Sequence, residues 1–207
     1  MFLRINPDKI NVADIERAVK CLKDGGIIIY PTDSVYALGC DLMNAKAIER
    51  VCKLKGVKPE KSNFSFICSD LSHLSDYCKA IDNPIFRIMK KALPGPYTFI
   101  LEASSKVPKL LKQNKKTVGI RVPDNKICKE LVLQLGNPII STSLHDEDDD
   151  MIDYFTDPEM VYQRYSDKVD MVIDGGFGNI YPSTVIDVSN DEIIVLREGL
   201  GDVSVLE

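Results

Sequence analysis

Residues 30–41 read Tyr-Pro-Thr-Asp-Ser-Val-Tyr-Ala-Leu-Gly-Cys-Asp and directly follow the apolar run Ile-Ile-Ile at residues 27–29. A short β-branched run after a Gly-Gly pair is typical of a buried strand. Pro31 has no N–H to donate, so it is expected to end this strand. The polar residues that follow are typical of a ligand-binding loop at a strand end of an α/β protein. A structural turn capped by Thr32 and Asp33 is the alternative that composition leaves open.

The patterns around this stretch mix helices and strands without strict alternation. Amphipathic or capped runs predict helices at residues 11–23, 44–56, 71–78, 84–92, 127–135 and 157–165. Apolar or alternating runs predict strands at residues 27–29, 64–68, 97–102, 117–122, 138–143, 169–173, 183–188 and 193–197, the last two antiparallel. This order predicts a single α/β domain over residues 1–207 with a mixed sheet, not a pure Rossmann sheet.

Composition narrows the class of protein. The chain has 207 residues, 44% of them hydrophobic and 28% charged, as expected for one globular domain. No apolar run approaches the roughly 20 residues of a membrane helix. The N-terminus also lacks the apolar core of a signal peptide, so we expect a cytoplasmic protein without a membrane partner. Six scattered cysteines and two histidines show no metal-ligand spacing, which argues against a disulfide framework or a Cys/His metal site.

The charge pattern leaves nucleic-acid binding open. A net charge of −5 argues against a surface coated in basic residues. Lysines nevertheless gather in two groups, which could line a local basic groove: Lys53, Lys55, Lys58 and Lys61, and then Lys112, Lys115 and Lys116 with Arg121. The acidic run at residues 146–150 is most simply a solvated loop.

Four further motifs follow the first in order. They are Pro-Gly-Pro-Tyr-Thr at residues 94–98, Thr-Val-Gly-Ile-Arg-Val-Pro at 117–123, Pro-Ile-Ile-Ser-Thr-Ser at 138–143, and Pro-Ser-Thr-Val-Ile-Asp at 182–187 with Leu-Arg-Glu-Gly at 196–199. An arginine inside an apolar strand, as at Arg121, must pair with a carboxylate of the fold or face a ligand anion. Three hydroxyls at a strand end suit phosphate binding or an ordinary Ser/Thr turn.

These five motifs resemble those of the YrdC/YciO family, the threonylcarbamoyl-AMP synthase family. Asn-Phe at residues 63–64, Thr-Ser-Leu at 142–144 and Arg-Glu-Gly at 197–199 resemble the YciO branch more than the YrdC branch. Two positions depart from the family pattern. Val57 stands where Lys-x-Arg would place its arginine, and Leu-His at residues 144–145 replaces Ala-Asn.

The resemblance implies a YrdC-like (YrdC/RibB) fold, with a twisted mixed sheet flanked by helices and a concave, positive groove. It implies an ATP-dependent nucleotidyltransferase that resembles L-threonylcarbamoyladenylate synthase. Such an enzyme converts L-threonine, bicarbonate and ATP into threonylcarbamoyl-AMP and pyrophosphate, for threonylcarbamoyladenosine modification of tRNA. Mg²⁺ would be carried by the nucleotide, so no protein metal site is expected.

The same resemblance assigns the site residues. The implied catalytic cations are Lys55, Arg121 and Arg197. The implied nucleotide-binding residues are Lys55, Asn63, Arg121, Ser141, Ser143 and Arg197, and the implied threonine-binding residues are Thr32, Tyr36, Ser183 and Thr184. Two other functions stay open. One is a module that binds double-stranded RNA or tRNA, and the other is a nucleotide-binding protein that acts on threonylcarbamoyl-AMP without efficient synthesis, which Val57 favours.

Overall fold

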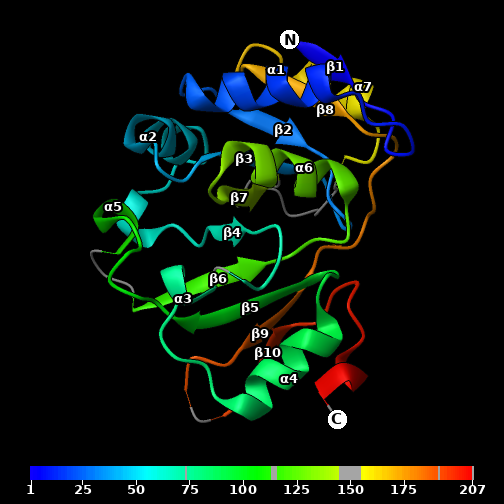
Figure 1. Ribbon diagram of the computed structural model, residues 1–207. Coiled ribbons are helices and arrows are strands. Elements are labelled where there is room, and N and C mark those ends of the chain that lie inside the picture. The colour runs from blue at the N-terminus through cyan, green and yellow to red at the C-terminus, as the bar shows by residue number, and fades with distance from the viewer. Residues whose placement is uncertain (73, 113–115, 145–154, 191, 207) are drawn as a thin grey trace.

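The computed structural model describes residues 1–72, 74–112, 116–144, 155–190 and 192–206. In this part of the chain ten strands form one mixed sheet in the order β1-β8-β2-β3-β7-β4-β6-β5-β9-β10 (Figure 1). The strands are β1 (Phe2–Arg4), β2 (Ile28–Tyr30), β3 (Ala37–Asp41), β4 (Ser65–Ile67), β5 (Tyr97–Glu102), β6 (Thr117–Arg121), β7 (Ile139–Ser143), β8 (Met171–Asp174), β9 (Thr184–Asp187) and β10 (Ile194–Arg197). The predicted single α/β domain with a mixed sheet is thus confirmed.

Helices flank this sheet. They are α1 (Val12–Lys23), α2 (Ala45–Leu54), α3 (Leu74–Tyr77), α4 (Asn83–Ala92), α5 (Lys109–Lys112), α6 (Lys126–Leu135) and α7 (Pro158–Tyr165), with 3₁₀ turns η1 (Pro59–Lys61) and η2 (Val203–Leu206). Asn11 and Asn44 cap α1 and α2, because each side chain accepts a bond from a first-turn N–H. Among the described helices, none is long and apolar enough to cross a membrane.

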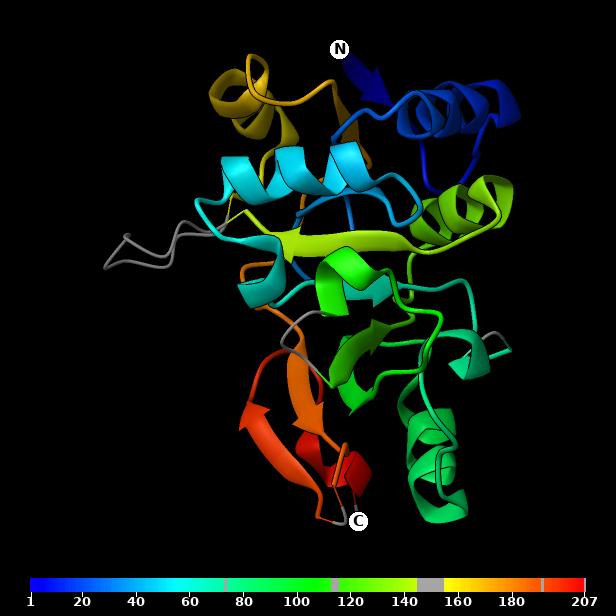
Figure 2. The same cartoon turned by 90° about the vertical axis from the view of Figure 1, so that its left-hand side faces the viewer.

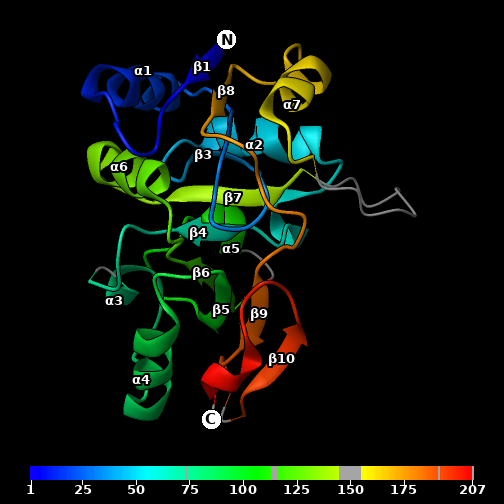
Figure 3. The same cartoon turned by 90° about the vertical axis from the view of Figure 1, so that its right-hand side faces the viewer.

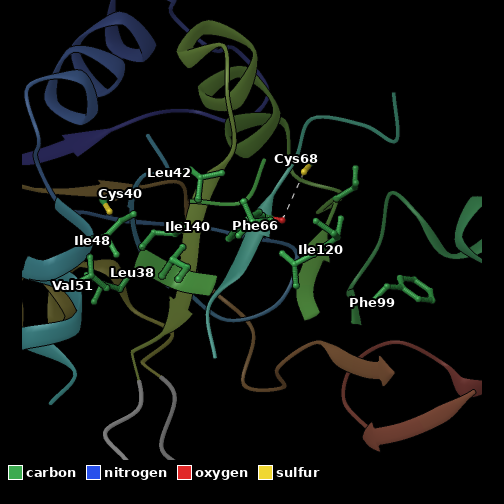
Figure 4. Packing of buried hydrophobic residues seen from close by; sticks show 14 of the residues in the cluster. Leu38, Cys40, Leu42, Ile48, Val51, Phe66, Cys68, Phe99, Ile120 and Ile140 are labelled. Atoms are coloured by element: carbon green, nitrogen blue, oxygen red, sulfur yellow. Dashed lines mark hydrogen bonds between the residues drawn. The ribbon is translucent and has the colours of Figure 1, made fainter. Parts of the chain in front are cut away.

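Strand β2 is buried on both faces of the sheet. Ile28 and Tyr30 of β2 belong to a cluster that includes apolar residues of α1 and α6. Ile29, between them in the strand, belongs to a second cluster with α2 and α7, because successive strand residues face opposite sides. Figure 4 shows this second cluster, in which Phe66 of β4 lies between the α2 side and Phe99 of β5.

The signature stretch is a hairpin, which the sequence did not predict. β2 pairs antiparallel with β3, with Tyr30 opposite Ala37. Only residues 31–36 form the connecting loop. The strand Ala-Leu-Gly-Cys-Asp lacks β-branched residues, so it carries no strand pattern of its own. Its Gly39 is required by the close approach of β7, because a Cβ atom there would lie 2.3 Å from the carbonyl oxygen of Ile140. The short edge strand β1 was missed as well.

The cysteines are free, and only Cys21 is partly exposed, while the other five are buried. Burial raises the pKa of the Cys52 and Cys78 thiols to about 11. A rise of two pKa units lowers the thiolate fraction about 100-fold below pH 9, and the thiolate is the reactive form. Burial raises the pKa of Cys21 as well, so we expect its partial exposure to make it the one fast-reacting thiol at pH 8 in a titration with Ellman's reagent. Cys21→Ser should abolish that phase, and a second fast thiol in the folded variant would contradict this packing.

Candidate functional site

A cavity of about 490 Å³ is lined by side chains from β3, β7, β4, β6, β5, β9 and β10. Figure 3 shows these strands in the sheet. This volume is typical of a small-molecule site. The predicted residues that line it are Lys55, Asn63, Arg121, Ser141, Ser143, Ser183 and Arg197. Its described lining holds three cationic side chains and no Asp or Glu. The cavity therefore suits an anion larger than a single phosphate.

Arg121 is the most deeply buried cation of the site. It ends β6, is 6% exposed, and donates from Nη2 to Asp33 Oδ1 at 3.0 Å and to Ser34 Oγ at 2.9 Å. The first alternative weighed for this arginine is therefore realised, because it pairs with a carboxylate of the fold. Arg121 also lines the cavity, and its contact with a ligand anion stays a prediction. Burial raises the pKa of Asp33, and the Arg121 charge opposes that rise.

Arg197 reaches the cavity from the edge strand β10. Its Nε and Nη2 donate to the carbonyl oxygen of Ser183 at 3.1 Å and 2.8 Å. The Ser183 hydroxyl lies 2.8 Å from that of Thr98, and both side chains are buried. These contacts tie β10 to the start of β9 and to β5, so they set the position of the guanidinium at the cavity wall.

The remaining lining groups come from strand and helix ends. Lys55 is the C-cap of α2, where a cation is favoured by the helix dipole. Ser141 and Ser143 of β7 pair with Gly39 and Ala37 of β3, and Ala37 lines the cavity beside the two serines. The site thus combines cations and hydroxyls, the groups that hold phosphates in proteins.

A family model described as "Sua5_yciO_yrdC: Telomere recombination" matches residues 20–199. The chain belongs to this family. It is 44% identical over 203 residues to "Uncharacterized protein YciO" of Escherichia coli K12, which covers 98% of this chain and 97% of that protein. The crystal structure of E. coli YciO superposes with a TM-score of 0.90 at 43% identity, covering 100% of this chain and 99% of that one. The predicted family and the likeness to the YciO branch are confirmed.

The names of two further similar proteins state an enzyme activity or a bound ligand. "Threonylcarbamoyl-AMP synthase" of Coxiella burnetii is 31% identical over 183 residues, which is 88% of this chain and 96% of that protein. The crystal structure of P. abyssi Sua5 complexed with L-threonine superposes with a TM-score of 0.87 at 26% identity. That superposition covers 96% of this chain and 57% of the Sua5 chain.

Three of the predicted threonine-binding residues do not line the cavity of this YciO-like protein. The Tyr36 hydroxyl donates to the carbonyl oxygen of Gly176 at 2.6 Å, and burial raises its pKa. Thr32 Oγ1 donates to the carbonyl oxygen of Val35 at 2.7 Å. Thr184 Oγ1 donates to the carbonyl oxygen of Gly201 at 2.6 Å. Direct contacts from these three hydroxyls to threonine stay a prediction.

The two positions that depart from the family pattern are Val57 and His145. Val57 packs against the apolar core and does not line the cavity, and its N–H donates to the carbonyl oxygen of Cys52 at 3.0 Å. His145 and the acidic run at residues 146–150 lie outside the described residues.

The basic groups near the site lie partly outside the described residues. In the first group, Lys53, Lys58 and Lys61 are exposed. In the second group, Lys115 is not described, and Lys116 is exposed. The segments that carry the two groups meet, because α5 lies against η1 (Figure 2). Binding of RNA along this surface stays a prediction.

Sequence reasoning missed several polar residues of the site. Asp33 and Ser34, which hold Arg121, lie within the signature stretch but could not be matched to an arginine 87–88 residues away. The hydroxyl residues Ser62, Ser65 and Thr98 also line the cavity. Thr98 carried a usable signal, because it is a polar residue in an otherwise apolar strand.

Proposed function

We propose that this protein condenses L-threonine, bicarbonate and ATP into threonylcarbamoyl-AMP, with release of pyrophosphate, for threonylcarbamoyladenosine modification of tRNA. The observation that carries this proposal is one cavity with three cations, Lys55, Arg121 and Arg197, and no carboxylate in its described lining. The family membership and the synthase of Coxiella burnetii support the same assignment.

The reaction needs positioning and charge compensation more than a covalent nucleophile. The threonine nitrogen forms a bond to the carbon of bicarbonate, and a C–O bond breaks with loss of water, which gives N-carboxythreonine. A carboxylate oxygen of this carbamate then forms a bond to the α-phosphorus of ATP. The bond from that phosphorus to the bridging oxygen then breaks, and its electron pair leaves with pyrophosphate. Cations placed beside the reacting phosphates offset the negative charge that develops. Lys55, Arg121 and Arg197 would supply this positive charge.

The neutral groups of the cavity would divide between the two substrates. Asn63, Ser141 and Ser143 would hold the nucleotide. Ser183 would contact threonine, since its side chain lines the cavity. Thr32, Tyr36 and Thr184 would hold the backbone of the cavity wall in place at the end where threonine binds, because their hydroxyls bond to backbone groups.

Magnesium fits the site as a companion of the nucleotide. Among the described residues no cluster of three or more His, Cys, Asp or Glu side chains could hold a metal ion. Mg²⁺ prefers oxygen ligands and commonly binds through substrate phosphates and water. When bound with ATP, it would neutralise part of the phosphate charge. The lining cations would act on the remaining phosphate charge.

The test is direct. Purified protein is incubated with ATP, bicarbonate, Mg²⁺ and labelled L-threonine, and threonylcarbamoyl-AMP and pyrophosphate are measured together. We expect equal amounts of both, with no product when threonine or bicarbonate is omitted. Nucleotide binding without product would overturn the proposal in favour of a nucleotide-binding protein. Sub-micromolar RNA binding at about 150 mM salt that ATP does not displace would favour the RNA-binding alternative, because non-specific phosphate contacts weaken with salt.

A further inference from the structure

The carboxylate of Asp33 is fixed at two points behind the cavity wall. Oδ1 accepts a bond from Arg121 Nη2 at 3.0 Å, and Oδ2 accepts one from the Asp124 N–H at 2.9 Å. The Asp33 side chain is only 8% exposed, and it does not line the cavity, whereas Arg121 does. Asp33 therefore does not touch the contents of the cavity, and any effect beyond that of its charge must act through Arg121.

This contact holds Arg121 by one end of its guanidinium. Nη2 bonds to both Asp33 and Ser34, while in the described part of the chain the buried Nε has no hydrogen-bond partner. The loop that supplies the two acceptors is itself braced, because the Ser34 N–H donates to Thr32 Oγ1 at 3.0 Å. A planar guanidinium anchored at one nitrogen keeps its other donors in a fixed direction.

Electrostatics alone would make Asp33 harmful in an anion site, because its negative charge repels a triphosphate. We propose that Asp33 is a positioning residue, which orients the Arg121 guanidinium toward the phosphates of a bound nucleoside triphosphate. The inference rests on the proposed function for the identity of the ligand. It requires that a fixed guanidinium favours ATP binding by more than the charge of one buried carboxylate opposes it.

Asp33→Asn distinguishes these two effects, because they change the affinity for ATP in opposite directions. The variant keeps the size of the side chain and removes its charge. Its amide replaces one carboxylate oxygen by an NH₂ donor, so it cannot accept from Arg121 at one position and from Asp124 at the other as the carboxylate does. If Asp33 were only a nearby charge, the variant would bind ATP more tightly. Loss of positioning instead weakens ATP binding, by about tenfold for a misplaced charge-assisted bond.

The experiment is a double-mutant cycle read by calorimetric titration with ATP. Wild type, Asp33→Asn, Arg121→Ala and the double variant are compared, with thermal melting to verify folding. We expect Asp33→Asn to weaken ATP binding about tenfold in the wild-type background and at most about twofold in the Arg121→Ala background. The matched control is Asp170→Asn, which alters a partly exposed Asp-Arg pair outside the cavity lining and should leave ATP affinity unchanged.

The outcomes separate this inference from the proposed function. Tighter ATP binding by Asp33→Asn, or an equal loss in both backgrounds, overturns the positioning role. ATP binding without formation of threonylcarbamoyl-AMP overturns the proposed function, and the cycle still decides the role of Asp33. If wild type does not bind millimolar ATP, both fall. Where product forms, Asp33→Asn should also lower the rate at saturating ATP, an effect that a KM change alone would not produce.

Discussion

Arg121→Ala is expected to lower the free energy of unfolding by about 3–5 kcal/mol, because it leaves the buried Asp33 carboxylate without its cation. The same change should weaken ATP binding by about 10- to 150-fold, the range for one charge-assisted hydrogen bond. Chemical denaturation gives the first quantity and calorimetry the second. An exposed pair behaves differently. Lys79→Ala, whose partner Glu102 is 47% exposed, should change stability by less than about 1 kcal/mol.

The cause can be verified by adding a second substitution. Asp33→Ala in the Arg121→Ala background removes the unpaired carboxylate, so the double variant should be more stable than Arg121→Ala alone. Replacing both partners of a buried polar pair is commonly less harmful than removing one. A double variant that is less stable than the single one would show that Asp33 stabilises the fold by some other contact.

The dependence on pH has a definite sign. Burial already raises the pKa of Asp33, and removal of the Arg121 charge removes an opposing effect, so the pKa rises further. A carboxyl group with a raised pKa in the folded state favours folding when it is protonated. The stability gap between Arg121→Ala and wild type should therefore narrow as pH falls from 7 toward 4. A gap that widens in acid would contradict this account.

Local signals predicted much of the fold. Helices α1 and α2 were recoverable because Asn caps, apolar spacing and a following glycine coincide in a few residues. The antiparallel pair of β9 and β10 was recoverable from two apolar runs around a turn. β3 was not, because its small residues gain their strand conformation from pairing with β2 and β7 on either side.

The sequence predicted which residues line the site, but it did not predict the contacts between them. The motifs identify seven of the residues that line the cavity, although they are spread from Lys55 to Arg197. The partner of Arg121 depends on β6 meeting the loop between β2 and β3, which no local pattern encodes. Thr184 reads like Ser183 in sequence, yet it is fully buried and only Ser183 lines the cavity. Neighbouring residues at the start of a strand face opposite sides of the sheet. Which of the two faces the cavity depends on the register of β9, and the sequence does not give that register.

Arg197→Ala is expected to lower the rate of threonylcarbamoyl-AMP formation about 100-fold at saturating substrates, the loss typical of one preorganised donor at a reacting oxyanion. Arg197 lies on an edge strand but donates two hydrogen bonds to the Ser183 carbonyl oxygen, so its removal should also lower the free energy of unfolding, by about 1–3 kcal/mol. The rate is measured by pyrophosphate release and the stability by chemical denaturation. Arg17→Ala, which removes an exposed helix arginine paired with Asp14, is the matched control and should leave both unchanged.

Arg197→Lys tests whether geometry or charge matters at this position. The guanidinium uses two nitrogens on the Ser183 carbonyl oxygen, and this contact orients the planar group at the cavity wall. A lysine keeps the charge but cannot present two donors in one plane, so we expect it to recover less than about a tenth of the lost rate. Full recovery by lysine would show that Arg197 supplies only charge. An unchanged rate in Arg197→Ala would remove this residue from the catalytic set, because a cation beside the reacting phosphates cannot be lost without raising the barrier.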